Sequence, residues 1–290
     1  MFNGALTALV TPFRDGEVDA PALRDLIEWQ IQSGIDGLVP CGSTGESATL
    51  THAEHDNVIK LTIEQARKRV PVIAGTGSNS TAEAIRLTAA AREMGADGAL
   101  LLSPYYNKPT QDGIFRHYKT IAAAVDLPLL VYNIPGRTAS NVLPETVARL
   151  AEIKHIVGIK EASASMDQAS DILKMCGDRI TILSGDDALT VPLMALGAKG
   201  VISTCSNVVP REMHDLAAAA LTGDFAKARE IHYRLLPLIR SLFVETNPIC
   251  IKQAVASMGK CANELRMPLV QMTAAPAERL RIAMKELRLI

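Results

Sequence analysis

The sequence predicts a (β/α)8 barrel, also called a TIM barrel, with a helical extension at its C-terminal end. Three observations lead to this prediction. Eight short runs precede Gly223, and most are continuously apolar, as parallel strands buried on both faces are. Helical patterns separate the runs, and no long linker interrupts the alternation. After Gly223 the strand signal stops and only helical patterns remain.

The expected strands follow one another with helix signals between them. They are the runs 5–10, 37–40, 70–74, 98–102, 128–132, 156–160, 180–183 and 200–203. The helix signals are Leu23, Ile27 and Ile31 at helical spacing, Thr51-x-x-Glu54 and Ser80-x-x-Glu83 as capping boxes, and Pro144 for a first turn. An open, doubly wound sheet is the alternative fold, but it usually has fewer strands in a chain of this length.

The chain is expected to divide after Gly223. Residues 1–223 would form the barrel that carries the active site, and residues 224–290 would form the helical extension packed on it. Asp224 can cap a helix that runs to about Val244. Two further helical stretches are expected near 249–258 and 274–287.

The composition is that of an ordinary globular protein and excludes several classes of function. The 290 residues carry a net charge of −1, so the chain lacks the basic excess of a nucleic-acid-binding surface. Gly, Pro or charged residues break the apolar runs, so no segment is expected to cross a membrane. The first residues lack the features of a signal peptide, which makes the cytoplasm the expected compartment. The five cysteines are widely spaced, which indicates buried thiols rather than disulfides or a zinc site.

The active site is expected where the strands end, because functional residues of a parallel barrel gather at the C-terminal ends of its strands. Lys160 ends the apolar run 156–159, so its side chain should start inside the mouth of the barrel. A free lysine with a pKa of about 10.4 is almost wholly charged near neutral pH, and burial would lower that pKa by ~2–3 units. The neutral amine can then attack a ketone to form an imine. Alternatively, Lys160 reaches solvent or pairs with Glu161.

Side chains on neighbouring strand ends fit the same chemistry. Tyr132 ends the adjacent strand, where its phenol could shuttle protons, or where the ring could simply pack at the barrel rim. Ser43 and Thr44 lie in a glycine-flanked loop that could hold a small carboxylate, although such a loop is also a common turn. Arg137 offers a bidentate fork for a carboxylate, unless it is a solvated loop cation.

Several motifs at these strand ends carry a family resemblance. They are GSTGE at 42–46, SPYYN at 103–107, YNIPGRT at 132–138 and GIKEAS at 158–163. The first, third and fourth, in this order, resemble the dihydrodipicolinate synthase/N-acetylneuraminate lyase superfamily, and the resemblance extends over nearly the whole chain. The second and third resemble its synthase branch in particular. The resemblance implies a Schiff-base lyase without metal or organic cofactor, which condenses pyruvate with L-aspartate-4-semialdehyde at the first committed step of lysine biosynthesis.

The resemblance also implies roles for single residues in catalysis. Lys160 matches the lysine that condenses with pyruvate, and Tyr132 matches the tyrosine that relays protons and positions the imine. Ser43 stands where many members have a second threonine in that relay. Tyr106 matches a tyrosine that completes the relay in the neighbouring subunit's site, which would make a tight dimer a condition for activity. Tetramers, as dimers of dimers, are usual in the family.

Substrate binding and regulation follow from the same resemblance. The substrate-binding positions are Thr44 for the pyruvate carboxylate, Arg137 for the semialdehyde carboxylate, and the backbone of Gly185 and Ile202 for the pyruvate pocket. The positions that bind feedback L-lysine at the dimer interface are Ser47, Ala48, His52, His55, Asn79, Glu83 and Tyr105. Alternatively, His52 and His55 are ordinary surface histidines. They are weak evidence for a metal site because no third ligand is evident.

Three other functions are compatible with parts of the pattern. A sibling lyase that cleaves N-acetylneuraminate or a 2-keto-3-deoxy sugar acid would share Lys160 and Tyr132 but would not need Arg137. A barrel that only senses pyruvate or lysine would not need a nucleophile. A metal-dependent aldolase would need clustered ligands, whereas the remaining histidines are scattered at positions 117, 155, 214 and 232.

Overall fold

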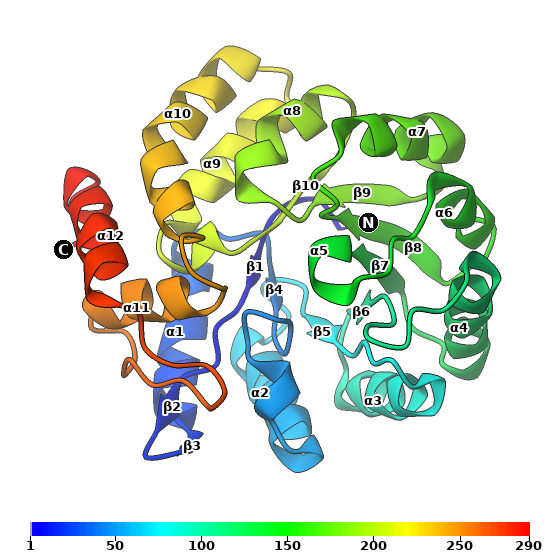
Figure 1. Ribbon diagram of the computed structural model, residues 1–290, viewed down its shortest axis with the longest axis horizontal. Coiled ribbons are helices and arrows are strands. Elements are labelled where there is room, and N and C mark those ends of the chain that lie inside the picture. The colour runs from blue at the N-terminus through cyan, green and yellow to red at the C-terminus, as the bar shows by residue number, and fades with distance from the viewer. Residues whose placement is uncertain (1) are drawn as a thin grey trace.

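The computed structural model describes residues 2–290 and contains the predicted barrel (Figure 1). Eight parallel strands form one sheet in the order β4-β1-β10-β9-β8-β7-β6-β5. A parallel bridge between Leu38 and Val72 joins the two ends of this sheet into a barrel. The strands are β1 (Gly4–Ala8), β4 (Gly37–Val39), β5 (Ile73–Gly75), β6 (Gly98–Leu102), β7 (Leu129–Asn133), β8 (Ile156–Glu161), β9 (Thr181–Ser184) and β10 (Gly200–Ser203).

The predicted fold class is therefore confirmed, and each expected strand is present with its bounds shifted by a few residues. The alternative of an open doubly wound sheet is wrong, because the sheet order returns on itself. Two very short strands were not predicted. They are β2 (Phe13–Arg14) and β3 (Glu17–Val18), which pair as an antiparallel hairpin. Met1, where the predicted barrel domain begins, lies outside the described residues.

Helices surround the sheet in Figure 1. Those that alternate with the strands are α1 (Ala20–Gln32), α2 (His52–Ala66), α3 (Thr81–Met94), α4 (Gln111–Ala124), α5 (Pro135–Thr138), α6 (Pro144–Leu150), α7 (Met166–Cys176), α8 (Thr190–Ala195) and α9 (Pro210–Leu221). Short 3-10 turns also occur, as η1 (Ser47–Thr49), η2 (Gly177–Arg179), η3 (Asp187–Leu189) and η4 (Cys205–Asn207). The extension consists of α10 (Phe225–Ser241), α11 (Ile249–Ser257) and α12 (Ala274–Glu286).

The helix starts follow the sequence signals, with one difference. Thr51 and Glu54 form a complete capping box at the start of α2, as predicted. At the start of α3, the Ser80 hydroxyl accepts the Glu83 backbone N–H, which is half of the predicted box. The other half is wrong, because the Glu83 carboxylate accepts hydrogen bonds from Ser78 and pairs with His52 instead. Two nearby donors therefore compete successfully with the backbone N–H of the cap.

Two groups of buried side chains hold the barrel together. The group inside the barrel contains Leu6, Ala8, Val39, Ile73, Leu100, Leu130, Tyr132, Leu183 and Ile202. A larger group lies between the strands and the surrounding helices. Leu235 and Leu280 of the extension belong to this larger group together with Leu216 of α9. The division of the chain after Gly223 stays a prediction, since one continuous apolar group includes residues on both sides of it.

Two further properties bear on the sequence predictions. The cysteines are free thiols, with four buried and Cys261 half-buried. None of the helices within residues 2–290 is long and apolar enough to cross a membrane.

Candidate active site

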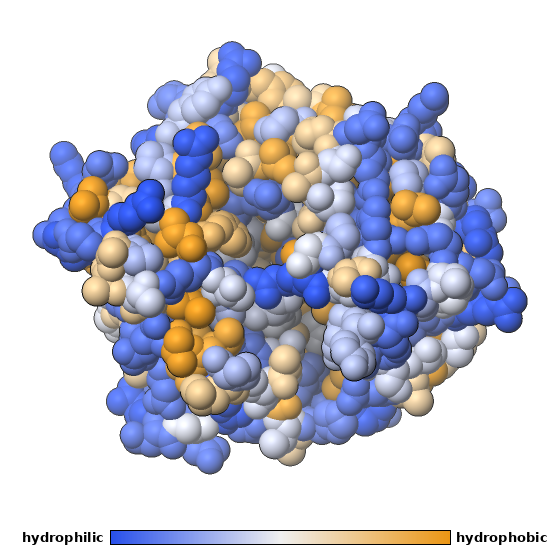
Figure 2. Space-filling view, in the orientation of Figure 1, coloured by the Kyte–Doolittle hydropathy of each residue, from blue (hydrophilic) through white to orange (hydrophobic). Residues whose placement is uncertain are grey.

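A small pocket opens at the C-terminal ends of the strands. Figure 2 shows a hollow near the centre of this face of the molecule. The pocket volume of about 50 Å³ is far below that of a pocket for a drug-sized ligand, so it fits only a small molecule. The lining residues are Ala8, Val39, Gly42, Ser43, Thr44, Leu100, Tyr132, Ile134, Arg137, Lys160, Gly185, Thr204, Phe243 and Asn247.

Lys160 lies at the floor of this pocket beside Tyr132. The two residues are direct partners across β7 and β8, and the Lys160 Nζ is 4.2 Å from the centroid of the Tyr132 ring. Both side chains are buried, each with 6% of its surface exposed. The alternative in which Lys160 reaches bulk solvent is therefore wrong.

The alternative in which Lys160 pairs with Glu161 is also wrong. Successive side chains of a strand point to opposite faces, so Glu161 points out of the barrel where Lys160 points in. The Glu161 carboxylate accepts hydrogen bonds from Asn133 Nδ2 at 3.1 Å and from the Ser163 backbone N–H at 2.6 Å. Among the described residues, no ion pair includes Lys160. The amine therefore faces the pocket without a carboxylate partner.

Gly185 leaves the space in which the Lys160 side chain lies. A Cβ atom added at Gly185 would be 3.0 Å from Lys160 Cε and 2.6 Å from Ala162 Cβ. Both distances are shorter than ordinary carbon contacts of ~3.5–4.0 Å. Any side chain at position 185 would therefore displace the lysine or its neighbour.

The loop after β4 brings the predicted carboxylate-binding hydroxyls to the pocket. Thr44 is buried, and its Oγ1 accepts a hydrogen bond from Asn247 Nδ2 at 2.9 Å. The adjacent Ser43 is half-buried and lines the same pocket. Arg137, on the short helix α5, donates from Nη2 to the backbone oxygen of Asn247 at 2.9 Å. Asn247 thus connects the two residues that were expected to bind carboxylates.

Asn247 is a site residue that the sequence analysis missed. Its side chain is buried in the pocket lining, and its Oδ1 atom has no hydrogen-bond partner. A buried amide oxygen without a partner can accept a hydrogen bond from a bound substrate. Asn247 lies in the extension, where no strand end marks a site, so the only signal was an isolated Asn-Pro turn dipeptide.

Asp187 supports another part of the pocket wall. Its Oδ2 accepts the backbone N–H groups of Thr204 at 3.1 Å and Cys205 at 2.9 Å, and Thr204 lines the pocket. Burial raises the pKa of the Asp187 carboxyl above its ordinary value, while hydrogen bonds from Ser203 and the two backbone groups oppose that shift. This carboxyl fixes the turn after β10, where the wall of the pocket continues.

Two of the residues predicted for catalysis or substrate binding lie apart from the pocket lining. Ile202 is buried inside the barrel in the apolar group below the pocket. Tyr106 is 87% exposed and has a left-handed backbone with φ of 72°. Within one chain, the Tyr106 phenol is thus presented to the outside rather than to the pocket.

The residues expected to bind L-lysine gather at the ends of α2 and α3, around η1. His52 Nε2 lies 2.9 Å from Glu83 Oε1, and Asn79 Nδ2 donates to the backbone oxygen of Tyr105 at 3.1 Å. Hydrogen bonds from Ser78 and then His52 lower the pKa of the Glu83 carboxyl.

The other three members of this set differ in exposure. Ser47 is half-buried and Ala48 is exposed, both within η1. His55 is buried, with Nε2 2.9 Å from the Gly75 oxygen, and its burial lowers its imidazole pKa. His52 and His55 therefore face different partners, as a pair of metal ligands would not.

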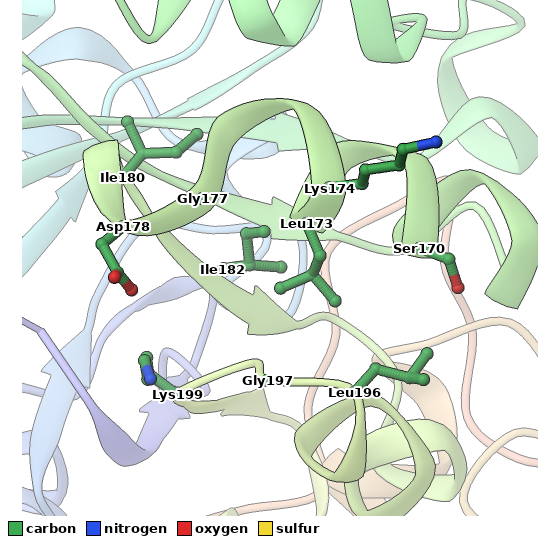
Figure 3. Close-up of a pocket in the computed structure, with 10 residues that line it drawn as sticks. All are labelled: Ser170, Leu173, Lys174, Gly177, Asp178, Ile180, Ile182, Leu196, Gly197 and Lys199. Carbon is green, nitrogen blue, oxygen red and sulfur yellow. The ribbon is translucent and has the colours of Figure 1, made fainter.

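A larger hollow lies at the opposite ends of the strands (Figure 3). Its volume is about 450 Å³, and Ser170, Leu173, Lys174, Gly177, Asp178, Ile180, Ile182, Leu196, Gly197 and Lys199 line it. These residues come from α7, from β9 and from the segments that lead into β9 and β10. No predicted site residue lies there, and active sites of such barrels form at the other face. A larger volume therefore does not identify the active site.

A buried lysine beside a tyrosine at the strand ends of a closed barrel is the arrangement that a lyase of the Schiff-base class requires. A family model for the dihydrodipicolinate synthetase family matches residues 1–287. The 4-hydroxy-tetrahydrodipicolinate synthase of Syntrophus aciditrophicus is 57% identical over 290 residues, which cover all of both chains. The chain belongs to this family, and by close homology its activity is that of a 4-hydroxy-tetrahydrodipicolinate synthase, an enzyme of lysine biosynthesis.

Solved structures of similar proteins agree with this assignment. The chloride-inhibited dihydrodipicolinate synthase from Acinetobacter baumannii, complexed with pyruvate, has a TM-score of 0.99 and 44% identity, with 100% of both chains covered. The enzyme from Cyanidioschyzon merolae with lysine bound has a TM-score of 0.97 and 41% identity, with 100% of this chain and 99% of that chain covered.

Proposed function

We propose that Lys160 is the nucleophile that forms an imine with pyruvate in this pocket. The amine adds to the keto carbon and water leaves, after which the methyl group of pyruvate loses a proton to give an enamine. The enamine carbon attacks the carbonyl of L-aspartate-4-semialdehyde. The amino group of the bound product then displaces Lys160 and closes the six-membered ring. The protonated imine accepts the electron pair, so this sequence needs no metal or organic cofactor.

The neighbouring side chains receive roles in the same proposal. Tyr132 transfers protons during imine formation, with Ser43 linking it to the rest of the relay. Thr44 and the backbone of Gly185 and Ile202 hold pyruvate, and Arg137 binds the semialdehyde carboxylate. The observation that carries the proposal is the buried, unpaired amine of Lys160, 4.2 Å from the Tyr132 ring. The pyruvate complex of the Acinetobacter baumannii enzyme supports pyruvate as the first substrate.

Reduction of the imine tests the role of Lys160. Borohydride added with pyruvate should leave one permanent adduct, measured by intact mass and located by peptide mapping. Lys160→Ala should abolish the adduct, whereas Lys199→Ala, in the hollow at the opposite end of the barrel, should retain it. An adduct of undiminished yield in Lys160→Ala would refute the proposal.

The role of Arg137 calls for a separate variant. Arg137→Ala should keep the pyruvate adduct but raise KM for the semialdehyde by about 10-fold or more, because a charge-assisted bidentate contact is lost. Steady-state kinetics at saturating pyruvate measure this. A wild-type KM for the semialdehyde would remove Arg137 from the binding site.

We further propose that L-lysine binds at His52, Glu83, Asn79 and Tyr105, with Ser47, Ala48 and His55 beside them, and inhibits the enzyme. Support comes from the lysine-bound structure of the Cyanidioschyzon merolae enzyme and from the partly exposed carboxylate of Glu83, whose charge suits an ammonium group. Calorimetry should detect binding to the wild type and a much weaker signal for Glu83→Ala, with His155→Ala as the surface control. Full activity in millimolar lysine without a binding signal would contradict this.

Tyr106 leads to a proposal about assembly. We propose that two chains form a tight dimer in which each Tyr106 completes the relay of the other site, and that dimers pair into tetramers. The 87% exposure of Tyr106 in a single chain supports an external role. Sedimentation of the purified enzyme, with Tyr106→Phe as the variant for activity, tests the assembly.

We also propose that the protein is cytoplasmic. The free thiols suit this compartment, where cysteines stay reduced.

A further inference from the structure

A buried ion pair joins the catalytic loop to the C-terminal extension. Glu46 ends the GSTGE segment that carries Ser43 and Thr44, and Lys252 lies in α11. Lys252 Nζ is 2.8 Å from Glu46 Oε1, and both side chains have 0% of their surface exposed. The two residues are more than 200 positions apart in the chain, so the pair fixes the loop relative to a distant segment.

Further polar contacts join the same segments. Lys252 donates to the backbone oxygens of Thr11 at 2.6 Å and Glu264 at 3.1 Å. Glu46 Oε2 accepts the backbone N–H of Arg266 at 3.1 Å. Burial lowers the pKa of Lys252, and the adjacent Glu46 opposes that shift. A buried charge is tolerated only where such partners surround it, so this pair is built into the interior rather than formed by chance.

The backbone conformation of this loop has to be stabilised by contacts with other segments. Cys41 and Glu46 flank the loop, and both have left-handed backbones, with φ of 56° and 54°. Residues other than glycine adopt this conformation at a cost and keep it only where surrounding contacts enforce it. Thr11 Oγ1 donates to the Gly45 oxygen at 2.7 Å, next to Glu46. Contacts therefore cluster at the C-terminal end of the loop.

We propose that the pair of Glu46 and Lys252 is a positioning device for pyruvate binding. It holds the loop in the conformation in which the Thr44 hydroxyl and nearby backbone N–H groups face the carboxylate of pyruvate. Neither Glu46 nor Lys252 lines the pocket, so both act through the loop and neither is a catalytic residue. The inference rests on the proposed role of Thr44.

The test separates positioning from general stability. The double variant Glu46→Gln/Lys252→Met replaces the charges by neutral groups of similar size, so no unpaired charge remains buried. Lys252→Met alone leaves the buried Glu46 carboxylate without a cation and should lower Tm by roughly 10 °C. The double variant should recover most of that loss in Tm. The double variant should still raise KM for pyruvate by about tenfold or more, with a much smaller change in kcat.

Matched controls make each outcome decisive. Val255→Ala, in the same helix, removes two buried methyl groups and should lower Tm without changing KM for pyruvate. If the double variant does not fold, Glu46→Asp replaces it, because it keeps both charges but withdraws the carboxylate by one methylene. A folded double variant or Glu46→Asp with wild-type KM for pyruvate overturns the inference.

Thr44→Val distinguishes this failure from failure of the proposed function. A raised KM for pyruvate in Thr44→Val, together with a wild-type KM in the double variant, would reject the positioning role alone. A wild-type KM in Thr44→Val would reject the proposed role of Thr44, and the positioning role would fall with it. Raised KM values in both variants would support both.

Discussion

Substitution of Gly185 by alanine is a small change that should disturb the amine of Lys160, the proposed nucleophile. The glycine lies against the side chain of Lys160, so the added methyl group would point at the lysine stem rather than at substrate. The methyl carbon would be 3.0 Å from Lys160 Cε, 3.1 Å from Lys160 Cγ and 2.6 Å from Ala162 Cβ. The backbone at Gly185 is not left-handed, so the effect is steric alone.

The size of the effect follows from these distances. Carbon atoms normally approach to ~3.5–4.0 Å, so the neighbours must move by roughly 0.5–1 Å. Overfilling of a packed site costs about 1–3 kcal/mol, which would lower Tm by a few degrees. If Lys160 is the nucleophile, a displacement of its amine by about 1 Å can reduce the rate on the order of 100-fold. Imine formation should therefore suffer more than stability.

Two measurements check this prediction for Gly185→Ala. The rate of borohydride trapping with pyruvate should fall by about 10- to 100-fold, and a thermal melt should show a modest loss of stability. Gly136→Ala is the control, since no atom lies within 4 Å of a Cβ built there and its backbone is not left-handed. If Gly185→Ala traps pyruvate at the wild-type rate, the steric reasoning is refuted.

Two further predictions concern buried ionisable groups. Burial lowers the pKa of His117 from 6.5 to about 4, so the folded state resists its protonation. The contribution of neutral His117 to the free energy of unfolding should be present in full above pH 6.5 and should fall by about 3 kcal/mol as the pH drops to 4. Denaturant titrations at several pH values measure this, and the free energy of unfolding of His117→Gln should depend less on pH. An identical pH profile in that variant would contradict this. Asp187→Ala leaves the N–H groups of Thr204 and Cys205 without an acceptor, so the free energy of unfolding should fall by about 2–5 kcal/mol, and less for Asp187→Asn. Equal Tm values for Asp187→Ala and the wild type would show that these bonds are not needed.

The barrel itself could be predicted because its signals are local. Each strand is a short apolar run, and each run is followed by a helix with its own start signal, so counting them suffices. The β2–β3 hairpin was missed because its strands have two residues each and show no periodicity. A signal did exist there, since Asp15 and Gly16 are both left-handed and Asp-Gly is a typical hairpin turn.

The sequence predicts only those site residues that lie at strand ends or within recognisable motifs. Lys160, Tyr132, Thr44 and Arg137 follow strands, and the structure brings them to one pocket. Asn247 escaped prediction because it reaches the pocket from the extension, through a contact that no local pattern encodes. Lys252 also escaped, since a single lysine in an apolar helix normally extends to solvent. Its buried partner is visible only in three dimensions.

The hydrogen bond between Asn247 and Thr44 spans 203 positions of the chain, which has a consequence for biosynthesis. A ribosome releases the N-terminal strands first, so the growing polypeptide can begin to assemble its sheet long before residue 247 emerges. The pocket acquires its last wall only when translation is nearly finished. Contacts between such distant segments also slow folding. Activity should therefore appear late during synthesis, after the polypeptide is already compact.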